Sequence, residues 1–178
     1  MKKLEKMASY KLPLKSLTFG TQVINYHLDG AFFNEIEHSE VTSGSVDVAL
    51  TVTRDKEESM ELAFVCKGVI TVPCDRCLAP MELAVDTAYD LHVTLGDELD
   101  DSNDGVLVVP EHWHELDVAP LMRDTVLLSI PLTHSHEDIA QCDATVVAHL
   151  SGVMDDDEAA ADVDPRWAAL GKLKEKEN

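Results

Sequence analysis

The stretch TVPCDRCLAP, residues 71–80, decides how the rest of the chain is interpreted. Its two cysteines, Cys74 and Cys77, are separated by two residues and follow directly on an apolar run. A C-x-x-C motif can be half of a zinc site, a redox dithiol or a tight turn that happens to contain sulfur. The sequence on either side of the motif helps to separate these alternatives.

Alternating apolar residues on both sides of the motif predict β-strands, because a period of two is typical of a half-buried strand. Such runs occupy residues 46–53, 62–66, 81–85 and 89–95, and a further run at 69–72 leads into Pro73 after an interruption at Lys67-Gly68. Their spacing predicts an antiparallel meander or small barrel, with the C-x-x-C in the turn of a hairpin around residues 73–80.

This setting argues against redox catalysis and leaves two interpretations of the cysteines open. A thioredoxin-like dithiol needs a helix after the strand in a βαβ unit, and none is visible here. Zinc needs two further ligands, for which His134, His136 and Cys142 are the candidates. The alternative is that the sulfurs only pack as small apolar groups. Apart from this zinc, no cofactor is predicted.

After the strands, the pattern changes to that of a helix. Residues 96–105, GDELDDSNDG, are acidic and rich in turn formers, and they predict a loop because they lack the ligand spacing of a calcium site. A strand is expected at 106–109. Apolar residues then recur at helical spacing, with Asp117 as a candidate N-cap, Pro120 in the first turn and Pro131 as the stop. They are Val118, Leu121, Met122, Thr125 and Leu128.

Beyond Pro131 no periodicity is apparent, and the chain ends in an acidic tether and a short helix. Residues 155–164 are mostly acidic. In DPRWAALGKLK, Asp164 suits an N-cap and Pro165 the first helical position, while Trp167 shares a face with following leucines. Such a helix either docks on a partner or packs on its own body. We therefore predict an α+β domain at 1–150 and a tether with its helix at 151–178.

The net charge of −20, from 34 acidic and 14 basic residues, favours a basic partner over nucleic acid. An acidic surface repels phosphates, whereas opposite potentials steer two proteins together. Solubility alone is the alternative explanation. Residues 1–20 depart from this pattern with five lysines and one glutamate, and this arm either touches RNA or folds back onto the acidic body.

Nothing in the sequence argues for catalysis or for a membrane. The run EHWHE contains His112 and His114, but no further ligands select themselves, so we expect an exposed loop. There is no phosphate-binding glycine loop and no H-E-x-x-H motif. No apolar run is long enough to span a membrane, and the basic N-terminus lacks the apolar core of a signal peptide, so a cytoplasmic location with reduced cysteines is expected.

Three motifs in this order resemble the YceD family: CDRCL after an apolar strand, the helix end Val126–Pro131 with the sequence VLLSIP, and the terminal DPRWAAL. The resemblance implies a bacterial factor for accumulation of the large-subunit (23S) ribosomal RNA, a family usually encoded beside a large-subunit ribosomal protein. Many members carry a second cysteine cluster after the helix. Here that place reads THSH, and only Cys142 remains, so a zinc site made by two C-x-x-C pairs is not available.

The sequence therefore predicts a non-enzymatic factor for large-subunit assembly, with an antiparallel, barrel-like sheet, one main helix and a tethered C-terminal helix. The expected partner is a basic ribosomal protein or an assembly intermediate. Specific contacts are expected from Arg76 and from Asp164, Pro165, Arg166 and Trp167. Two alternatives stay open: a zinc-stabilised interaction module with no ribosomal role, and a metal enzyme that uses the histidine pairs.

Overall fold

A computed structural model describes residues 10–34 and 40–156 of the chain. The chain divides into two compact units, Met1–Ser135 and His136–Asn178. The first unit contains the sheets and the main helix, and the described part of the second contains one further α-helix. The predicted boundary after residue 150 stays a prediction.

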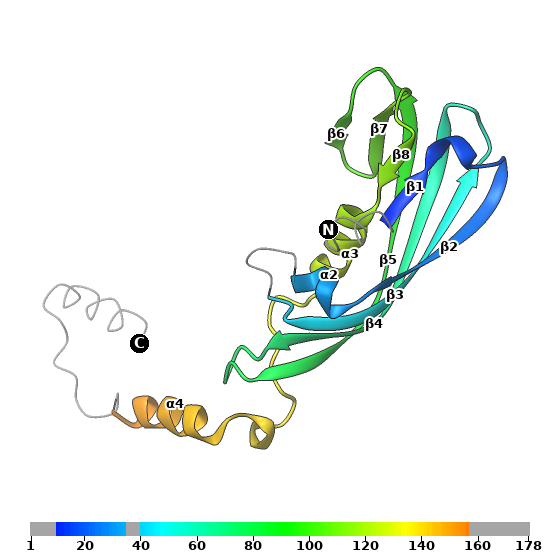
Figure 1. Cartoon of the computed structure of the whole chain (residues 1–178). Helices are drawn as coiled ribbons and strands as arrows, with labels where there is room; N and C mark the ends of the chain where they lie inside the picture. Colours follow the sequence, from blue (N-terminus) through cyan, green and yellow to red (C-terminus); the bar gives the residue numbers. More distant parts are fainter. Residues whose placement is uncertain (1–9, 35–39, 157–178) are drawn as a thin grey trace, which may run out of the picture. The chain divides into compact units, whose positions relative to one another are not determined.

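Six strands of the first unit form one mixed sheet (Figure 1). Their order is β2-β3-β4-β5-β7-β6, and all neighbours are antiparallel except β5 and β7, which are parallel. The strands are β2 (Gly20–Leu28), β3 (Ser43–Arg54), β4 (Ser59–Pro73), β5 (Pro80–Gly96), β6 (Asp100–Asn103) and β7 (Val106–Pro110). A separate two-stranded sheet pairs β1 (Lys11–Pro13) with β8 (Glu115–Asp117).

The predicted α+β class is confirmed, but the sheet is open and the expected barrel-like closure is not observed. β2 and β6 are its edges, and no ladder joins them within the described residues. β6 lies in the segment that was expected to be a loop, and all four of its side chains are exposed. A short, charged edge strand resists further pairing, which gives a physical reason why the sheet stays open.

The two central strands are longer than the sequence patterns predict. Residues 62–66 and 69–72 belong to the single strand β4, and residues 81–85 and 89–95 belong to the single strand β5. They pair from Ser59 opposite Thr94 to Pro73 opposite Pro80, which confirms the predicted hairpin.

Gly68 is the reason why β4 looked interrupted. It lies between Cys66 and Ile70, which both face the core, so the strand keeps its alternation through the glycine. A Cβ added at Gly68 would lie 2.2 Å from the carbonyl oxygen of Ser45 on β3. The glycine therefore allows a close approach of two backbones and does not end the strand.

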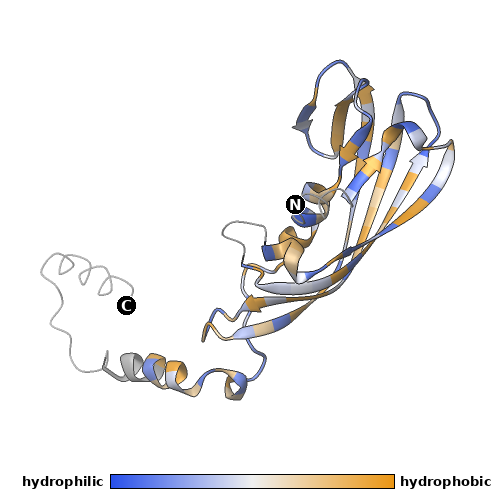
Figure 2. Cartoon of the chain, in the orientation of Figure 1, coloured by the Kyte–Doolittle hydropathy of each residue, from blue (hydrophilic) through white to orange (hydrophobic). Residues whose placement is uncertain are grey.

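One face of the sheet carries the hydrophobic core, and α-helices cover it (Figures 1 and 2). The alternation along the strands, visible as alternating colours in Figure 2, places Leu50, Phe64 and Leu91 on this face. Met122 of α3 (Ala119–Leu128) and Phe33 of α2 (Gly30–Asn34) are fully buried against it. Burying one such side chain contributes about 1.5–3 kcal/mol, so this shared core fixes the first unit.

The predicted main helix is present as α3, with two corrections. Its N-cap is Val118, and the carboxylate of Asp117 instead accepts a hydrogen bond from the backbone N–H of Ala119 at 3.0 Å. Leu128 was expected on the buried face but is 85% exposed. Six residues beyond Met122, it is rotated by about 120° around the helix axis, away from the sheet.

The described part of the basic N-terminal arm folds back onto the first unit. Lys11 forms an ion pair with Glu115 at 3.1 Å, across the β1–β8 ladder. The ammonium of Lys15 lies 2.8 Å from Nε2 of His114. These two lysines agree with the alternative in which the arm folds back onto the acidic body. Residues 1–9 lie outside the described residues.

The second unit contains a helix that the sequence analysis did not predict. α4 (Ala144–Asp156) begins after Asp143, whose Oδ1 accepts hydrogen bonds from the backbone N–H groups of Thr145 and Val146. The hydrogen bonds from Thr145 also lower the pKa of the Asp143 carboxyl. α4 extends into the predicted tether, and residues 157–178, with the predicted terminal helix, lie outside the described residues.

None of the described helices combines the length and the hydropathy that a membrane span requires.

Replacing Gly68 by alanine is expected to lower the free energy of unfolding by about 1–3 kcal/mol, because the added methyl group must push β3 and β4 apart. The melting temperature, followed by circular dichroism, would fall by about 2–4 °C for each kcal/mol.

Lys67→Ala is the matched control. Lys67 is the neighbour on the same strand, and its exposed pairing with Asp86 at 3.4 Å contributes little. The control should change the stability by less than about 0.5 kcal/mol. Equal losses in the two variants would contradict a steric role for the glycine.

Candidate metal centre

The C-x-x-C motif forms the turn between β4 and β5. The backbone N–H of Cys74 donates to the carbonyl of Ala79 at 2.9 Å, and that of Leu78 donates to the carbonyl of Cys74 at 2.8 Å. Both cysteines are buried, with exposures of 0% and 4%, whereas Asp75 and Leu78 are exposed. The turn thus directs both thiols inward and presents the side chains of other residues outward.

Leu78 has a backbone conformation that is unusual for its residue type. Its φ is +59°, and no other non-glycine residue of the described ranges has a positive φ. The left-handed region costs a residue with a Cβ about 1–2 kcal/mol, which is why glycine usually occupies it. In a turn, a left-handed residue brings successive N–H groups to one side and makes a concavity for an anion such as a thiolate. The strain is therefore located where a metal-binding turn would need it.

Asp75, between the two cysteines, binds the segment that follows α3. Its backbone N–H donates to the carbonyl of His134 at 2.9 Å, and its Oδ2 accepts from the backbone N–H of His134 at 2.6 Å. The guanidinium of the next residue, Arg76, donates to Oγ of Ser135 at 3.4 Å. These contacts lie within the first unit and hold its last residue against the turn.

His136 and Cys142 lie close together at the start of the second unit. Their segment is shaped by the 3₁₀-helix η3 (Ile139–Gln141), which Asp138 caps by accepting from the backbone N–H of Ala140 at 2.9 Å. The backbone N–H of Cys142 bonds to the carbonyl of Ile139, and its Sγ lies 3.6 Å from Nδ1 of His136. A thiol and an imidazole are thereby placed as neighbours by local structure alone.

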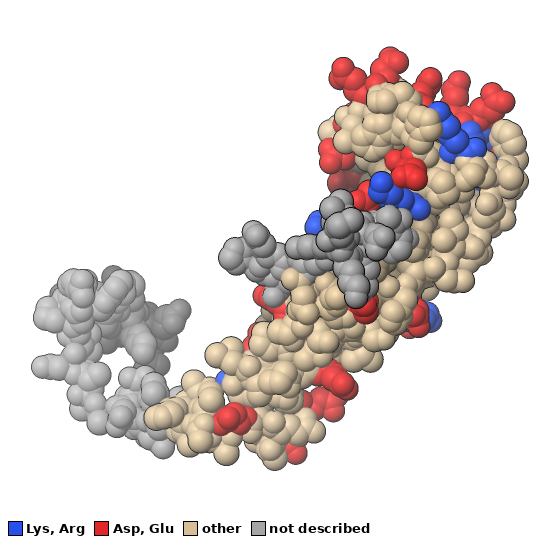
Figure 3. Space-filling model, in the orientation of Figure 1, with Lys and Arg blue, Asp and Glu red and all other residues tan. Residues whose placement is uncertain are grey.

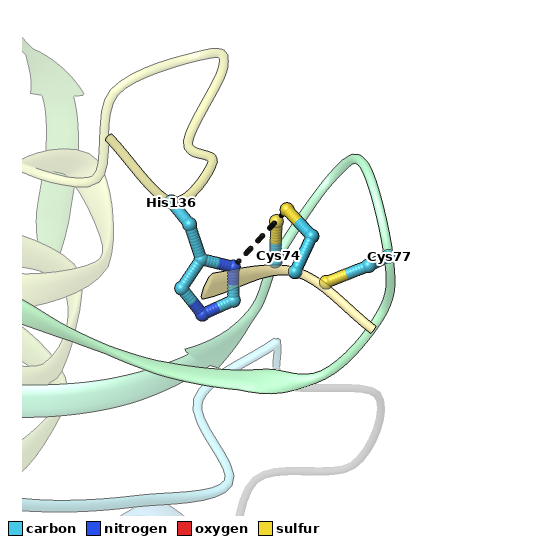
Figure 4. A group of neighbouring side chains, drawn as sticks. Cys74, Cys77 and His136 are labelled. Atoms are coloured by element: carbon cyan, nitrogen blue, oxygen red, sulfur yellow. Dashed lines mark hydrogen bonds between the residues drawn. The ribbon is translucent and has the colours of Figure 1, made fainter. Parts of the chain in front are cut away.

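Cys74, Cys77, His136 and Cys142 form a group in which the ligand atoms all lie within 4.8 Å of one another. Figure 4 shows the side chains of Cys74, Cys77 and His136 pointing toward one another. The three cysteines are buried, and His136 is partly buried. His136 follows directly on Ser135, the residue that Arg76 contacts.

The chemistry of this group fits a metal ion. Three thiols and one imidazole are one of the usual ligand sets of structural zinc, which is tetrahedral and has no open position. With Zn–S bonds of about 2.3 Å, the sulfurs of such a site are about 3.8 Å apart, so each pair of sulfurs needs to approach by about an ångström or less. The four side chains could therefore hold a metal, and they leave no ligand position for a substrate.

The structure separates the five metal-ligand candidates of the sequence analysis into two kinds. Four of them form the group, whereas His134 is not part of it. His134 is 8% exposed, and its Nδ1 lies 3.3 Å from the carbonyl oxygen of Pro131. Its backbone is bound to Asp75 of the turn, within the first unit.

The remaining candidates lie elsewhere or outside the described residues. Cys66 is fully buried in the core of the sheet, and this burial raises the pKa of its thiol to about 11. His112 and His114 line an open pocket of the first unit together with Lys11 and belong to no metal group among the described residues. The predicted partner-binding residues Asp164, Pro165, Arg166 and Trp167 lie outside the described residues.

Sequence reasoning missed the residues that hold the site in place. The pairing of Asp75 with His134 joins residues 59 positions apart, and no local pattern indicates it. The positive φ of Leu78 was also missed, because a leucine after the second cysteine carries no signal for that conformation. A glycine there would have been a signal.

The comparisons with known proteins agree with the resemblance of the motifs. Residues 62–174 match a family model described as "Large ribosomal RNA subunit accumulation protein YceD". The chain is similar to the uncharacterized protein YlbN of Bacillus subtilis (strain 168), with 28% identity over 123 residues that cover 66% of this chain and 68% of that protein. No solved structure matches the chain. Because the family match extends over more than half of the chain, from within β4 through the cysteine turn and α3 to residue 174, the chain belongs to the YceD family.

Proposed function

We propose that this protein is a non-enzymatic factor for assembly of the large ribosomal subunit and thereby supports accumulation of 23S ribosomal RNA. The observation that carries this proposal is the family match, since the family is described by accumulation of large-subunit ribosomal RNA. The candidate metal group supports a role without catalysis, because it offers four protein ligands and no open position.

The direct partner in this proposal is a basic ribosomal protein or an assembly intermediate that exposes one. The net charge of −20 makes RNA phosphates unfavourable neighbours and attracts lysine- and arginine-rich surfaces. Arg76 and the segment 164–167 are the proposed specific contacts, and the charge of the body provides the long-range attraction.

One end of the sheet, which we call the acidic end, concentrates this charge. It comprises the β3–β4 turn and the loop and strand that follow β5. These segments are adjacent, because the backbone N–H of Leu95 donates to the carbonyl of Glu58 at 2.8 Å. Exposed carboxylates dominate the surface there, and Figure 3 shows them gathered at the end with β6 and β7. They are Asp55, Glu57, Glu58, Asp97, Glu98, Asp100, Asp101 and Asp104, against Arg54 and Lys56.

The proposed metal is zinc, with Cys74, Cys77, His136 and Cys142 as its ligands. The donor set supports zinc, since thiolates with one imidazole suit this ion better than calcium or magnesium, which prefer oxygen. Zinc here would be structural. It would cross-link the hairpin turn and the segment after α3 and would stabilise the surface that the turn presents.

A second candidate function is a zinc-stabilised interaction module with no ribosomal role. The metal group favours it, because its chemistry does not depend on the family match. The third alternative, a metal enzyme that uses the histidine pairs, has no support from the described residues. There His112, His114 and His134 belong to no metal group, and the group that contains His136 leaves no open position.

Neutralising three carboxylates at the acidic end should weaken binding to large-subunit precursors. We expect the variant Asp97→Asn, Glu98→Gln, Asp101→Asn to co-sediment with precursor particles about tenfold less well than the unchanged chain at low salt. The difference should shrink as salt rises, because exposed charges are screened beyond about 10 Å at 0.1 M. Quantitative sedimentation over a salt series measures both effects.

The variant Glu40→Gln, Glu82→Gln, Asp90→Asn is the matched control, since it removes three exposed carboxylates elsewhere in the first unit. It should bind nearly as well as the unchanged chain. If the unchanged chain, the acidic-end variant and the control variant bound equally well, the acidic end would not contribute to binding. Failure of the unchanged chain to bind any precursor or large-subunit protein would contradict the proposed ribosomal role.

The full chain, purified without a histidine tag, should contain one zinc per molecule. Zinc at a thousandfold excess over its Kd contributes about 4 kcal/mol, so chelation should lower the melting temperature by about 8–16 °C. The zinc affinity should also fall at acidic pH, because protons compete for the thiolates and the imidazole. Metal analysis and calorimetry check these outcomes.

Two pairs of substitutions separate the ligands from their neighbours. Cys142→Ser and His136→Asn should lose zinc, whereas Cys66→Ser and His134→Asn should retain one ion per chain. Cys142→Ser is paired with Cys66→Ser, and His136→Asn is paired with His134→Asn. Each pair makes the same chemical change at a proposed ligand and at a residue outside the group. Zinc loss in His134→Asn but not in His136→Asn would show that the ligand set is wrongly assigned.

A further inference from the structure

Leu78 combines two unfavourable properties that rarely occur in one residue. Its backbone has a φ of +59°, which is strained for any residue with a Cβ, and its side chain is 76% exposed. Burial of the side chain would compensate for the strain, but this side chain gains little from burial. Glycine would relieve the backbone and remove the exposed apolar surface, so the leucine is unfavourable on both counts for the isolated chain. Strain of this kind points to function when the surroundings enforce it.

The surroundings hold Leu78 rigidly. Its N–H is bonded within the turn, to the carbonyl of Cys74, and both cysteines beside it are buried. The turn is also bound to the segment after α3, through Asp75 and His134. An anchor that is fixed before binding loses little conformational freedom when it binds.

The segment that is bound to the turn carries a second exposed leucine. Leu132 is fully exposed, at 103%, and lies two residues before His134, whose backbone pairs with Asp75. Polar side chains accompany the two leucines, since Asp75 is exposed and Arg76 is partly exposed. Apolar side chains with a polar rim are the usual composition of a protein–protein contact.

We propose that Leu78 is a partner-binding anchor, which the cysteine turn inserts into an apolar pocket of another protein, with Leu132 and Arg76 at the edge of the contact. The proposal rests on the proposed ribosomal function only for the choice of probe. A leucine has no aromatic face on which a base could stack, and a chain of charge −20 repels both RNA and anionic lipid. The same charge opposes association with a second copy of the chain.

Substitutions at position 78 test the anchor without disturbing the turn. Asparagine tolerates positive φ and glycine is relaxed there, but both lack the apolar side chain. Methionine keeps an apolar side chain of similar size. The zinc content and melting temperature of Leu78→Asn and Leu78→Gly should equal or exceed those of the unchanged chain. Their affinity for purified large-subunit precursor particles and large-subunit proteins should fall at least tenfold, and Leu78→Met should stay within threefold.

Val23→Thr is the control at an exposed apolar residue on the edge strand β2, and it should bind like the unchanged chain. If the unchanged chain binds and Leu78→Asn binds equally well, the anchor is refuted and the ribosomal function is not. If Leu78→Met binds as weakly as Leu78→Asn, an apolar anchor is refuted as well.

If the unchanged chain binds none of these probes, the ribosomal function fails and the anchor is tested without it. A photo-crosslinking amino acid is placed at position 78, and at position 23 as control, in cells of the native host. One protein adduct specific to position 78, displaced by excess unchanged chain but not by Leu78→Asn, supports the anchor. No adduct, or adducts only to RNA, to lipid or to a second copy, overturns it.

Discussion

The pairing between Asp75 and His134 is the contact on which the candidate site depends. It joins the β4–β5 turn to the segment after α3 through two hydrogen bonds, at 2.9 and 2.6 Å. A hydrogen bond to a charged group contributes about 1.5–3 kcal/mol, and the half-exposed carboxylate of Asp75 places this one toward the lower end. That energy is modest, but the pairing holds His134, two residues before His136, against the turn that contains the two thiols. The aspartate of the C-x-x-C thus binds the last residues of the first unit and is not part of the metal group itself.

A metal would act on the same turn and segment, which explains how the strain at Leu78 can be tolerated. The left-handed leucine costs about 1–2 kcal/mol. The hydrogen bonds of the turn and of Asp75 offset a part of this cost, and zinc, where bound, offsets more by restraining the thiols. The long pairing of β4 with β5 adds a rigid base, because the hairpin is anchored by core residues on both strands. Strain is thus confined to one residue of a well-supported turn.

The sequence predicted those parts of the fold that depend on local patterns. Alternation predicted β3, β4, β5 and their hairpin, and a helical period predicted α3, because burial of one face dictates both. The strands β1, β2, β6 and β8 were not predicted. It did not predict the continuity of β4 through Gly68, since that depends on how closely β3 approaches. It placed Leu128 on the wrong face and overlooked α4. For the site it supplied the four residues of the metal group, but it could not choose between His134 and His136, because the choice depends on the long-range pairing with Asp75.

Charge and the anchor would act at different ranges. The acidic end lies at the β3–β4 turn and β6, whereas the cysteine turn closes the opposite end of the β4–β5 hairpin. Electrostatic attraction extends over about 10 Å at 0.1 M salt and mainly raises the rate of encounter. A buried apolar anchor mainly lowers the rate of dissociation. A basic partner long enough to span this hairpin could engage both ends. Salt would then change the rate at which the complex forms, and Leu78 would determine how slowly it dissociates.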